Sequence, residues 1–325
     1  MTKLKIFSVF TILIAFLAFK NSEKILETFS TTYDPAKQDK AAPILFDENQ
    51  QLEDLKYLSS DDFMGRATGH KGGLKARDFI VEKFQKLGLE KLNGSYIQSF
   101  DFKGKSHHDK PTEVTAHNVL GFIKGSKYPD QYIVLGAHYD HLGVKDGKIF
   151  NGADDNASGT CALFSLASYL KENQPKHSVI FAAWDAEELG LQGAKYFVEN
   201  SIVGQDNLIL NLNIDMIGRN ANNELYICGS RYHEELKFDL VPAIQSNKIK
   251  LSTGHDGADG KDDWTFASDH GPFHKAGIPF LYFGVEDHPD YHRDTDEFSS
   301  INQDFYIEAT KVLVRAFEKA DIMYK

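Results

Sequence analysis

The chain carries a series of histidine and carboxylate residues that follow or end apolar runs, and these are residue types that bind zinc. Two metals about 3.5–4 Å apart need one shared carboxylate and two further ligands each. In a metal-dependent hydrolase, a further side chain that does not bind metal must also take a proton from the water that attacks the substrate. The candidates are His138 in GAHYDHLG, Asp155 in GADDNASG, Glu187 and Glu188 in WDAEELG, Asp215 in LNIDMIG and His292 in DYHRDTDEF. The set therefore predicts a two-metal hydrolase.

Alternating apolar and amphipathic segments must position these side chains. Predicted strands cover residues 131–139, 178–184, 207–214, 224–229 and 278–284, with earlier strands at 95–102 and, at a sheet edge, 115–123. Predicted helices cover residues 52–59, 73–87, 158–172, 190–200, 234–246, 269–276 and 303–320. The later strands are almost continuously apolar, which indicates burial on both sides. We expect an α/β fold with a mainly parallel twisted sheet and helices on both faces.

The candidate ligands fall where such a sheet binds its ligands. His138 and Asp215 end predicted strands, the two glutamates follow another, and His292 lies in the loop after the last. Asp155 precedes a predicted helix. In open parallel sheets, ligands bind outside the carboxyl ends of the strands. We therefore expect these residues to converge at one edge.

Composition limits the classes of function. The chain has 325 residues, is 42% hydrophobic and 26% charged, and is globular in composition, with one large domain or two small ones. Its formal charge of -11 argues against a nucleic-acid partner, since phosphates demand a basic face. Cys161 and Cys228 lie in apolar patterns and are most simply read as buried small residues, although export would permit a disulfide.

The N-terminus predicts export. Lys3 and Lys5 precede an apolar run over residues 6–19, which is short for a membrane span and fits a signal-peptide core. No clean cleavage site follows, so residues 1–20 are read as a signal peptide or an uncleaved anchor. Residues 21–45 are read as a flexible tether and residues 46–325 as the catalytic domain. We expect a periplasmic or secreted protein, held at a membrane only if the anchor is retained.

Four motifs in order carry a resemblance to a known family. They are H-x-D at His138, D-x-x-S-G at Asp155, D-A-E-E at Asp185 and the Tyr291–His292 pair. From about residue 52 to its end, the chain resembles the di-zinc aminopeptidases, which include secreted bacterial leucyl aminopeptidases. Glutamate carboxypeptidases, transferrin-receptor ectodomains and glutaminyl cyclases are related to that family. The resemblance implies the zinc-exopeptidase (phosphorylase/hydrolase-like) architecture.

The resemblance also implies residue roles and two Zn²⁺ ions per chain. Asp155 would bridge the metals, with His138 and Asp215 on one and Glu188 and His292 on the other. Glu187 would be the general base, and the peptide bond after Asp155 would be cis. Two further residues complete the expected catalytic set. Asp140 would hold the second ring nitrogen of His138, and the Tyr291 hydroxyl would stabilise the oxyanion.

The expected function is zinc-dependent removal of N-terminal amino acids from peptides with a free N-terminus, through a metal-bound hydroxide. Three alternatives stay open: a glutaminyl cyclase, a carboxypeptidase that binds a substrate carboxylate through Arg219, Arg231 or Arg293, and a receptor-like domain without activity. With five ligand places filled, the other histidines are read as spare, and Ser268-Asp269-His270 is rejected as a triad because adjacent residues rarely converge. The spare histidines are His141, His255, His270, His274 and His288.

Overall fold

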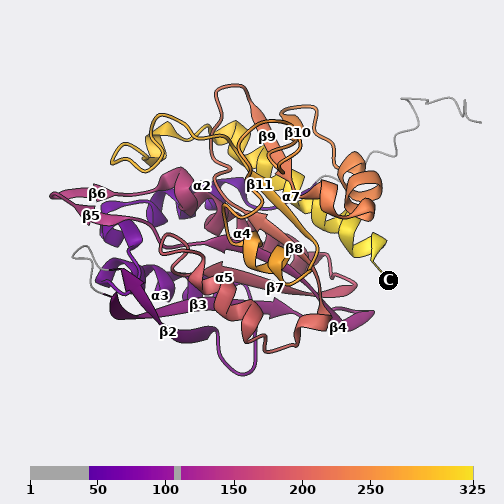
Figure 1. Ribbon diagram of the computed structural model, residues 1–325, viewed down its shortest axis with the longest axis horizontal. Coiled ribbons are helices and arrows are strands. Elements are labelled where there is room, and N and C mark those ends of the chain that lie inside the picture. The colour runs from indigo at the N-terminus through magenta and orange to yellow at the C-terminus, as the bar shows by residue number, and fades with distance from the viewer. Residues whose placement is uncertain (1–43, 106–110, 325) are drawn as a thin grey trace, which may run out of the picture. The chain divides into compact units, whose positions relative to one another are not determined.

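The structure is a computed structural model that describes residues 44–105 and 111–324 (Figure 1). The predicted signal peptide or anchor, and nearly all of the predicted tether, lie outside the described residues. Within those described ranges, no helix has the length and apolar character needed to cross a bilayer.

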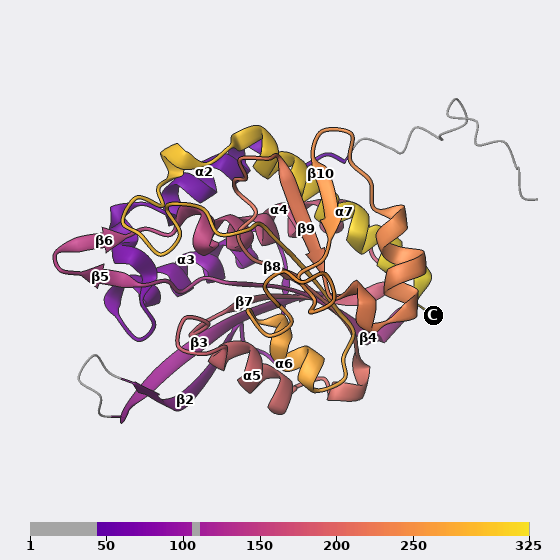
Figure 2. The same cartoon turned by 45° about the horizontal axis from the view of Figure 1, so that its top comes forward.

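A nine-stranded sheet forms the centre of the described domain, in the order β1-β3-β7-β4-β8-β11-β9-β10, with β2 also paired to β3. The four strands β7, β4, β8 and β11 run parallel to one another. The strands are β1 Glu90–Lys91, β2 Ile97–Lys105, β3 Pro111–Ile123, β4 Tyr128–His138, β7 His177–Trp184, β8 Leu208–Ile214, β9 Glu224–Cys228, β10 Lys250–Thr253 and β11 Phe280–Gly284. A separate hairpin joins β5 Gly143–Lys145 to β6 Lys148–Phe150 and projects from one side (Figures 1 and 2).

Helices cover both faces of the sheet. One layer contains α2 Glu48–Leu58, α3 Lys71–Lys86, α4 Gly159–Glu172 and α7 Gln303–Met323. The other contains α5 Gln192–Glu199 and α6 His270–Lys275, which lie side by side under the sheet in Figure 2. Alternate residues of one strand enter the two layers: Ile133 and Leu135 pack with the first, and Val134 with the second. This alternation explains why the central strands are apolar almost throughout.

The predicted fold class is confirmed, and three local predictions are corrected. Residues 115–123 do not form a sheet edge, because β3 pairs with β7 on one side and with β1 and β2 on the other. Residues 234–246 are helical only as far as Ala243, with a π-helix at Leu236–Leu240 and a 3-10 helix at Val241–Ala243 in place of one regular α-helix. Pro242 lacks the amide hydrogen that a continuing helix requires. The hairpin was missed, although its Asp146-Gly147 turn is a known hairpin signal.

Candidate metal centre

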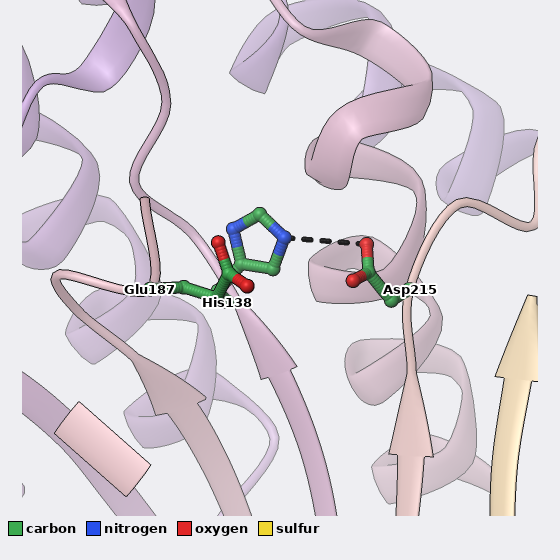
Figure 3. A group of neighbouring side chains, drawn as sticks. All are labelled: His138, Glu187 and Asp215. Carbon is green, nitrogen blue, oxygen red and sulfur yellow. Dashed lines mark hydrogen bonds and ion pairs between the residues drawn. The ribbon is translucent and has the colours of Figure 1, made fainter. Parts of the chain in front are cut away.

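The predicted ligands lie together at the carboxyl edge of the four parallel strands. His138 ends β4, Asp215 follows β8, and Glu187 and Glu188 follow β7. His292 lies in the loop after β11. Figure 3 shows His138, Glu187 and Asp215 above the ends of their strands, drawn together from segments far apart in the sequence. The parallel register aligns these strand ends, so the convergence follows from the fold.

One group of ligand atoms surrounds His138. Its Nε2 lies 3.2 Å from Asp215 Oδ1, the contact drawn in Figure 3, and 3.4 Å from Asp155 Oδ1. Glu187 offers a carboxylate oxygen to the same group. Burial opposes charge on the imidazole, but the charges of Asp215 and Glu187 outweigh burial and raise the pKa of His138 well above its usual value. This part of the site therefore favours a positive charge.

A second group surrounds the other oxygen of Asp155. His292 Nε2 lies 3.2 Å from Asp155 Oδ2 and 3.4 Å from Glu188 Oε2. His141, which sequence reasoning set aside, also lies here, with Nδ1 2.8 Å from Glu188 Oε1. Asp155 thus faces His138 with one oxygen and His292 with the other. It has the position required of a carboxylate shared by two cations.

Adjacent aspartates in GADDNASG do different work. The carboxylate of Asp154 is satisfied within the protein, because it accepts hydrogen bonds from the Gly218 amide at 2.6 Å and from His288 at 3.1 Å. By contrast, Asp155 Oδ2 has no hydrogen-bond partner among the described residues. The amides of both aspartates donate to the Asp296 carboxylate at 3.0 Å, which fixes the loop. The bond after Asp155 is cis, which confirms the expectation drawn from the resemblance.

Asp140 holds a different group from the one expected. The His138 Nδ1 contact is with the Asp140 backbone carbonyl at 3.1 Å, whereas the Asp140 carboxylate lies 3.8 Å from that nitrogen. The carboxylate accepts hydrogen bonds from the amides of Glu187 at 3.0 Å and Glu188 at 3.3 Å. Asp140 therefore fixes the direction of the glutamate pair, and only its backbone orients His138.

The pKa of Glu187 is raised well above its usual value. Burial is the main cause; His138 opposes it, and the carboxylates of Asp269, Asp215 and Glu188 add to it. Asp269 is itself fully buried, and burial raises its pKa to about 7. Glu187 is thus the member of the pair held closest to the protonated form, which suits a group that accepts and returns a proton.

Tyr291 lies over His292, with ring centroids 3.9 Å apart. Burial and the nearby carboxylates, Asp155 first, raise the pKa of its phenol. A phenol that keeps its proton remains a hydrogen-bond donor. Tyr291 lies near the carboxylates of the candidate ligands. Its hydroxyl forms no hydrogen bond with a described residue.

The remaining spare histidines lie outside the two ligand groups. His255 stacks on Trp264, His270 binds the Trp264 carbonyl, and His274 packs on Tyr232. His288 binds Asp154, as described above. The Ser268 hydroxyl meets Asn213 and not His270, in keeping with the rejected triad.

Arg66 was missed by sequence reasoning. Its guanidinium is fully buried and donates to the carbonyls of Tyr139 at 2.8 Å and Gly152 at 2.9 Å. It also binds the carbonyls of Leu58 and Asn151. One cation therefore fastens together the loop after β4 and the loop before Asp155. Nothing in the local pattern DDFMGRATG reveals this role, because the partners are backbone atoms far along the chain.

The donor set fits divalent metal. Asp155 Oδ2, Glu188 Oε1 and His141 Nδ1 are buried without hydrogen-bond partners among the described residues. Buried polar atoms are normally satisfied, so these three point to a missing partner that all of them share. Imidazole nitrogen and carboxylate oxygen are the ligands that zinc accepts. The residues present are thus suited to hold the metals that the sequence predicts.

Comparison with known proteins decides the family. The model of peptidase family M28 matches residues 118–317. The chain belongs to this family. Aminopeptidase YwaD of Bacillus subtilis is 30% identical over 224 residues, which cover 64% of this chain and 46% of that protein. The chain spans less than half the length of the first curated relatives that it matches.

Solved structures show the same fold. A zinc aminopeptidase from Bacillus subtilis aligns with a TM-score of 0.70 at 18% identity, over 86% of this chain and 96% of that one. A glutaminyl cyclase from Bacteroides thetaiotaomicron, solved with N-acetylhistamine, aligns with a TM-score of 0.66 at 18% identity, over 84% and 97% of the two chains. The predicted zinc-exopeptidase architecture is confirmed, and the likeness at this identity concerns the fold alone.

Proposed function

We propose that this M28 family member is an exported aminopeptidase that holds two zinc ions and removes N-terminal amino acids from peptides. The observation that carries the proposal is Asp155, whose two oxygens face His138 on one side and His292 on the other. A carboxylate so placed offsets the repulsion between two neighbouring cations. Export is proposed from the N-terminal sequence alone.

The residues divide into two metal sites around the shared Asp155. His138 and Asp215 would hold one zinc, and Glu188 and His292 the other. When bound, zinc polarises a substrate carbonyl and lowers the pKa of a coordinated water toward about 7. The protein itself excludes bulk water from the shared ligand, since Asp155 is 3% exposed.

Glu187 would act as the base. Asp140 fixes the backbone amides of both glutamates, so Glu188 is directed to the His292 side while Glu187 lies in the His138 group. Its raised pKa fits a carboxylate that takes a proton from water and then gives it to the leaving amine. Tyr291, with its phenol kept protonated, would donate to the developing oxyanion.

Substrate direction is inferred from charge. The site gathers the candidate ligands Asp155, Glu188 and Asp215 with two further carboxylates, Glu187 and Asp269, that the proposed zinc ions do not use. Because zinc would offset the charge of its ligands, a free α-amine would be held by a remaining carboxylate or by a metal, and an N-acetylated amine by neither. A carboxypeptidase would need a basic group for the substrate carboxylate. Of the arginines considered, Arg219 is paired with Asp290 at 2.5 Å and Arg231 with the Asp256 carbonyl at 2.9 Å. The exposed Arg293 is left as the single candidate of those three.

A panel of aminoacyl amides, their N-acetylated forms and an N-terminal glutaminyl peptide tests the proposal. We expect hydrolysis of the free-amine amides alone, abolished by chelation and restored by zinc. Pyroglutamate formation would assign the cyclase activity instead, and cleavage of C-terminal residues the carboxypeptidase activity. Metal binding without any turnover would favour the receptor-like alternative.

A further inference from the structure

His141 is a buried imidazole whose ring nitrogens form no hydrogen bond with a described residue, although Nδ1 lies within ion-pair distance of Glu188. Its side chain is 0% exposed, and neither Nδ1 nor Nε2 has a hydrogen-bond partner among the described residues. An unsatisfied buried polar group costs about 1–3 kcal/mol, so such groups are rare without a functional reason. Its place three residues after His138, in the loop that Arg66 fastens, puts it inside the metal centre.

The surroundings of His141 Nδ1 are those of a ligand. Glu188 Oε1 lies 2.8 Å from it and Asp155 Oδ2 lies 3.6 Å from it. These two oxygens also lack hydrogen-bond partners, and the three atoms lie within 4.8 Å of one another. The short contact between Nδ1 and Oε1 is not aligned as a hydrogen bond. Three atoms of ligand type therefore face one another without a hydrogen bond that satisfies any of them.

The separations fit a common cation. Ligands at 2.0–2.2 Å from zinc in tetrahedral geometry lie about 3.4 Å apart. The distances from Asp155 Oδ2 to His292 and to His141 are 3.2 and 3.6 Å. The two imidazole rings have centroids 5.9 Å apart and planes inclined at 55°, so they approach the same carboxylates from different directions.

The backbone leaves space for this ring. Gly152 has a φ of +50°, and a Cβ there would lie 2.0 Å from the Asp155 carbonyl oxygen and 2.5 Å from His141 Cδ2. The glycine is therefore required first by the Asp155 turn, and it also leaves the space that the His141 ring occupies.

We propose that His141 is a further protein ligand, through Nδ1, of the zinc held by Asp155, Glu188 and His292. This inference rests on the proposed function, since it concerns one of the two metals assigned there. A ligand at His141 would make the two metal sites unequal. The zinc near Asp215 has three protein ligands, counting Asp155, and the zinc near Glu188 has four. The four-ligand zinc is held more tightly and leaves less room for substrate atoms.

His141→Phe tests the proposal, because phenylalanine keeps a ring and removes the ligand nitrogen. His141→Asn serves as the conservative variant, since its amide oxygen can reach the region of Nδ1. The matched control is His177→Phe, another fully buried histidine, which is paired with Asp321 at the opposite end of β7. All four proteins are loaded with zinc for affinity and stoichiometry, and with cobalt for spectroscopy.

We expect wild type and His177→Phe to bind two metals. In His141→Phe, one metal is retained and the other weakened by more than about 100-fold, above the 10–100-fold loss typical of residues that only orient a ligand. The cobalt protein loses one paramagnetically shifted imidazole N–H signal, and His141→Asn recovers part of the affinity. Two metals of unchanged affinity and an unchanged set of cobalt-shifted signals in both His141 variants would overturn the proposal.

The metal content of the wild-type protein tests the proposed function independently of the His141 variants. Fewer than two metals in wild type would contradict the two-zinc centre before any variant is considered. If His141→Phe does not fold, His141→Asn decides the question. Loss of one cobalt-shifted signal in His141→Asn would support metal ligation by His141. A full set of signals with normal metal affinity would contradict it.

Discussion

The two ends of β7 use the same residue types for opposite purposes. At the amino end, Asp321 of α7 accepts the amides of Lys176 and His177 and the His177 ring, each at 2.8 Å. At the carboxyl end, Asp155 Oδ2 and Glu188 Oε1 are buried beside histidines and accept no hydrogen bond from a described residue. A buried carboxylate completed by its own chain fixes structure, whereas one left incomplete is available to a cation. A buried carboxylate lies beside a buried histidine at both ends of β7, so burial does not distinguish the two ends. The number of hydrogen bonds that each carboxylate oxygen accepts does distinguish them.

The strongest test of this contrast is Asp155→Asn. The change removes the negative charge that the two proposed metals would share, so we expect loss of both zincs and a fall in turnover of more than about 10⁴-fold. Metal analysis and steady-state kinetics measure the two effects. Asp154→Asn is the adjacent control and should keep both metals, because Asp154 is bound by Gly218 and His288. Full metal occupancy in Asp155→Asn would refute the bridge.

Glu187→Gln tests whether proton transfer and metal binding depend on different residues at the carboxyl end of β7. We expect kcat to fall by about 10²–10⁴-fold with two zincs retained, since the amide cannot accept the proton. The neighbouring Glu188→Gln should instead weaken zinc binding on the His292 side. A loss of only a few-fold in Glu187→Gln would remove that residue from the role of base.

Asp321→Asn tests the amino end of β7, where the carboxylate has a structural role. It leaves one acceptor for three donors, so we expect a loss of about 1–3 kcal/mol in the free energy of unfolding. Urea denaturation measures the loss. Zinc content and kcat at 25 °C should match wild type. Reduced activity at unchanged stability would show that the two ends are coupled and not separate.

The smallest expected effect concerns the cysteines. Cys161 and Cys228 are both free and buried, so a reducing agent should leave the thermal unfolding midpoint unchanged. Thiol labelling should find two reactive groups in denaturant and none in the folded state. A midpoint that falls on reduction would reveal a disulfide.

The sheet and most candidate ligands could be read from the sequence, because apolar runs and the residues at their ends are local features. The role proposed for His141 could not be read from the sequence. Counting five places as filled excluded it, and only the folded structure shows an imidazole with no other partner. Asp140 was predicted to hold His138 through its carboxylate, but that carboxylate accepts hydrogen bonds from the amides of Glu187 and Glu188. Such backbone partners follow no periodicity and depend on how loops cross.

The prediction of an α-helix at residues 234–246 was right about helical structure but wrong about its type and end. The segment forms a π-helix and then a 3-10 helix that ends at Ala243, and Pro242 cannot supply the amide hydrogen of a continuing α-helix. The failure lies away from the metal centre, so it does not alter the reading of the site.

The buried guanidinium of Arg66 has a consequence for the order of assembly. It joins the ligand-bearing loops by hydrogen bonds to four carbonyls, none of which involves a ligand atom. The loops are therefore tied together by the polypeptide alone. We expect the protein to keep this arrangement without metal, so that zinc would bind to loops that are already folded.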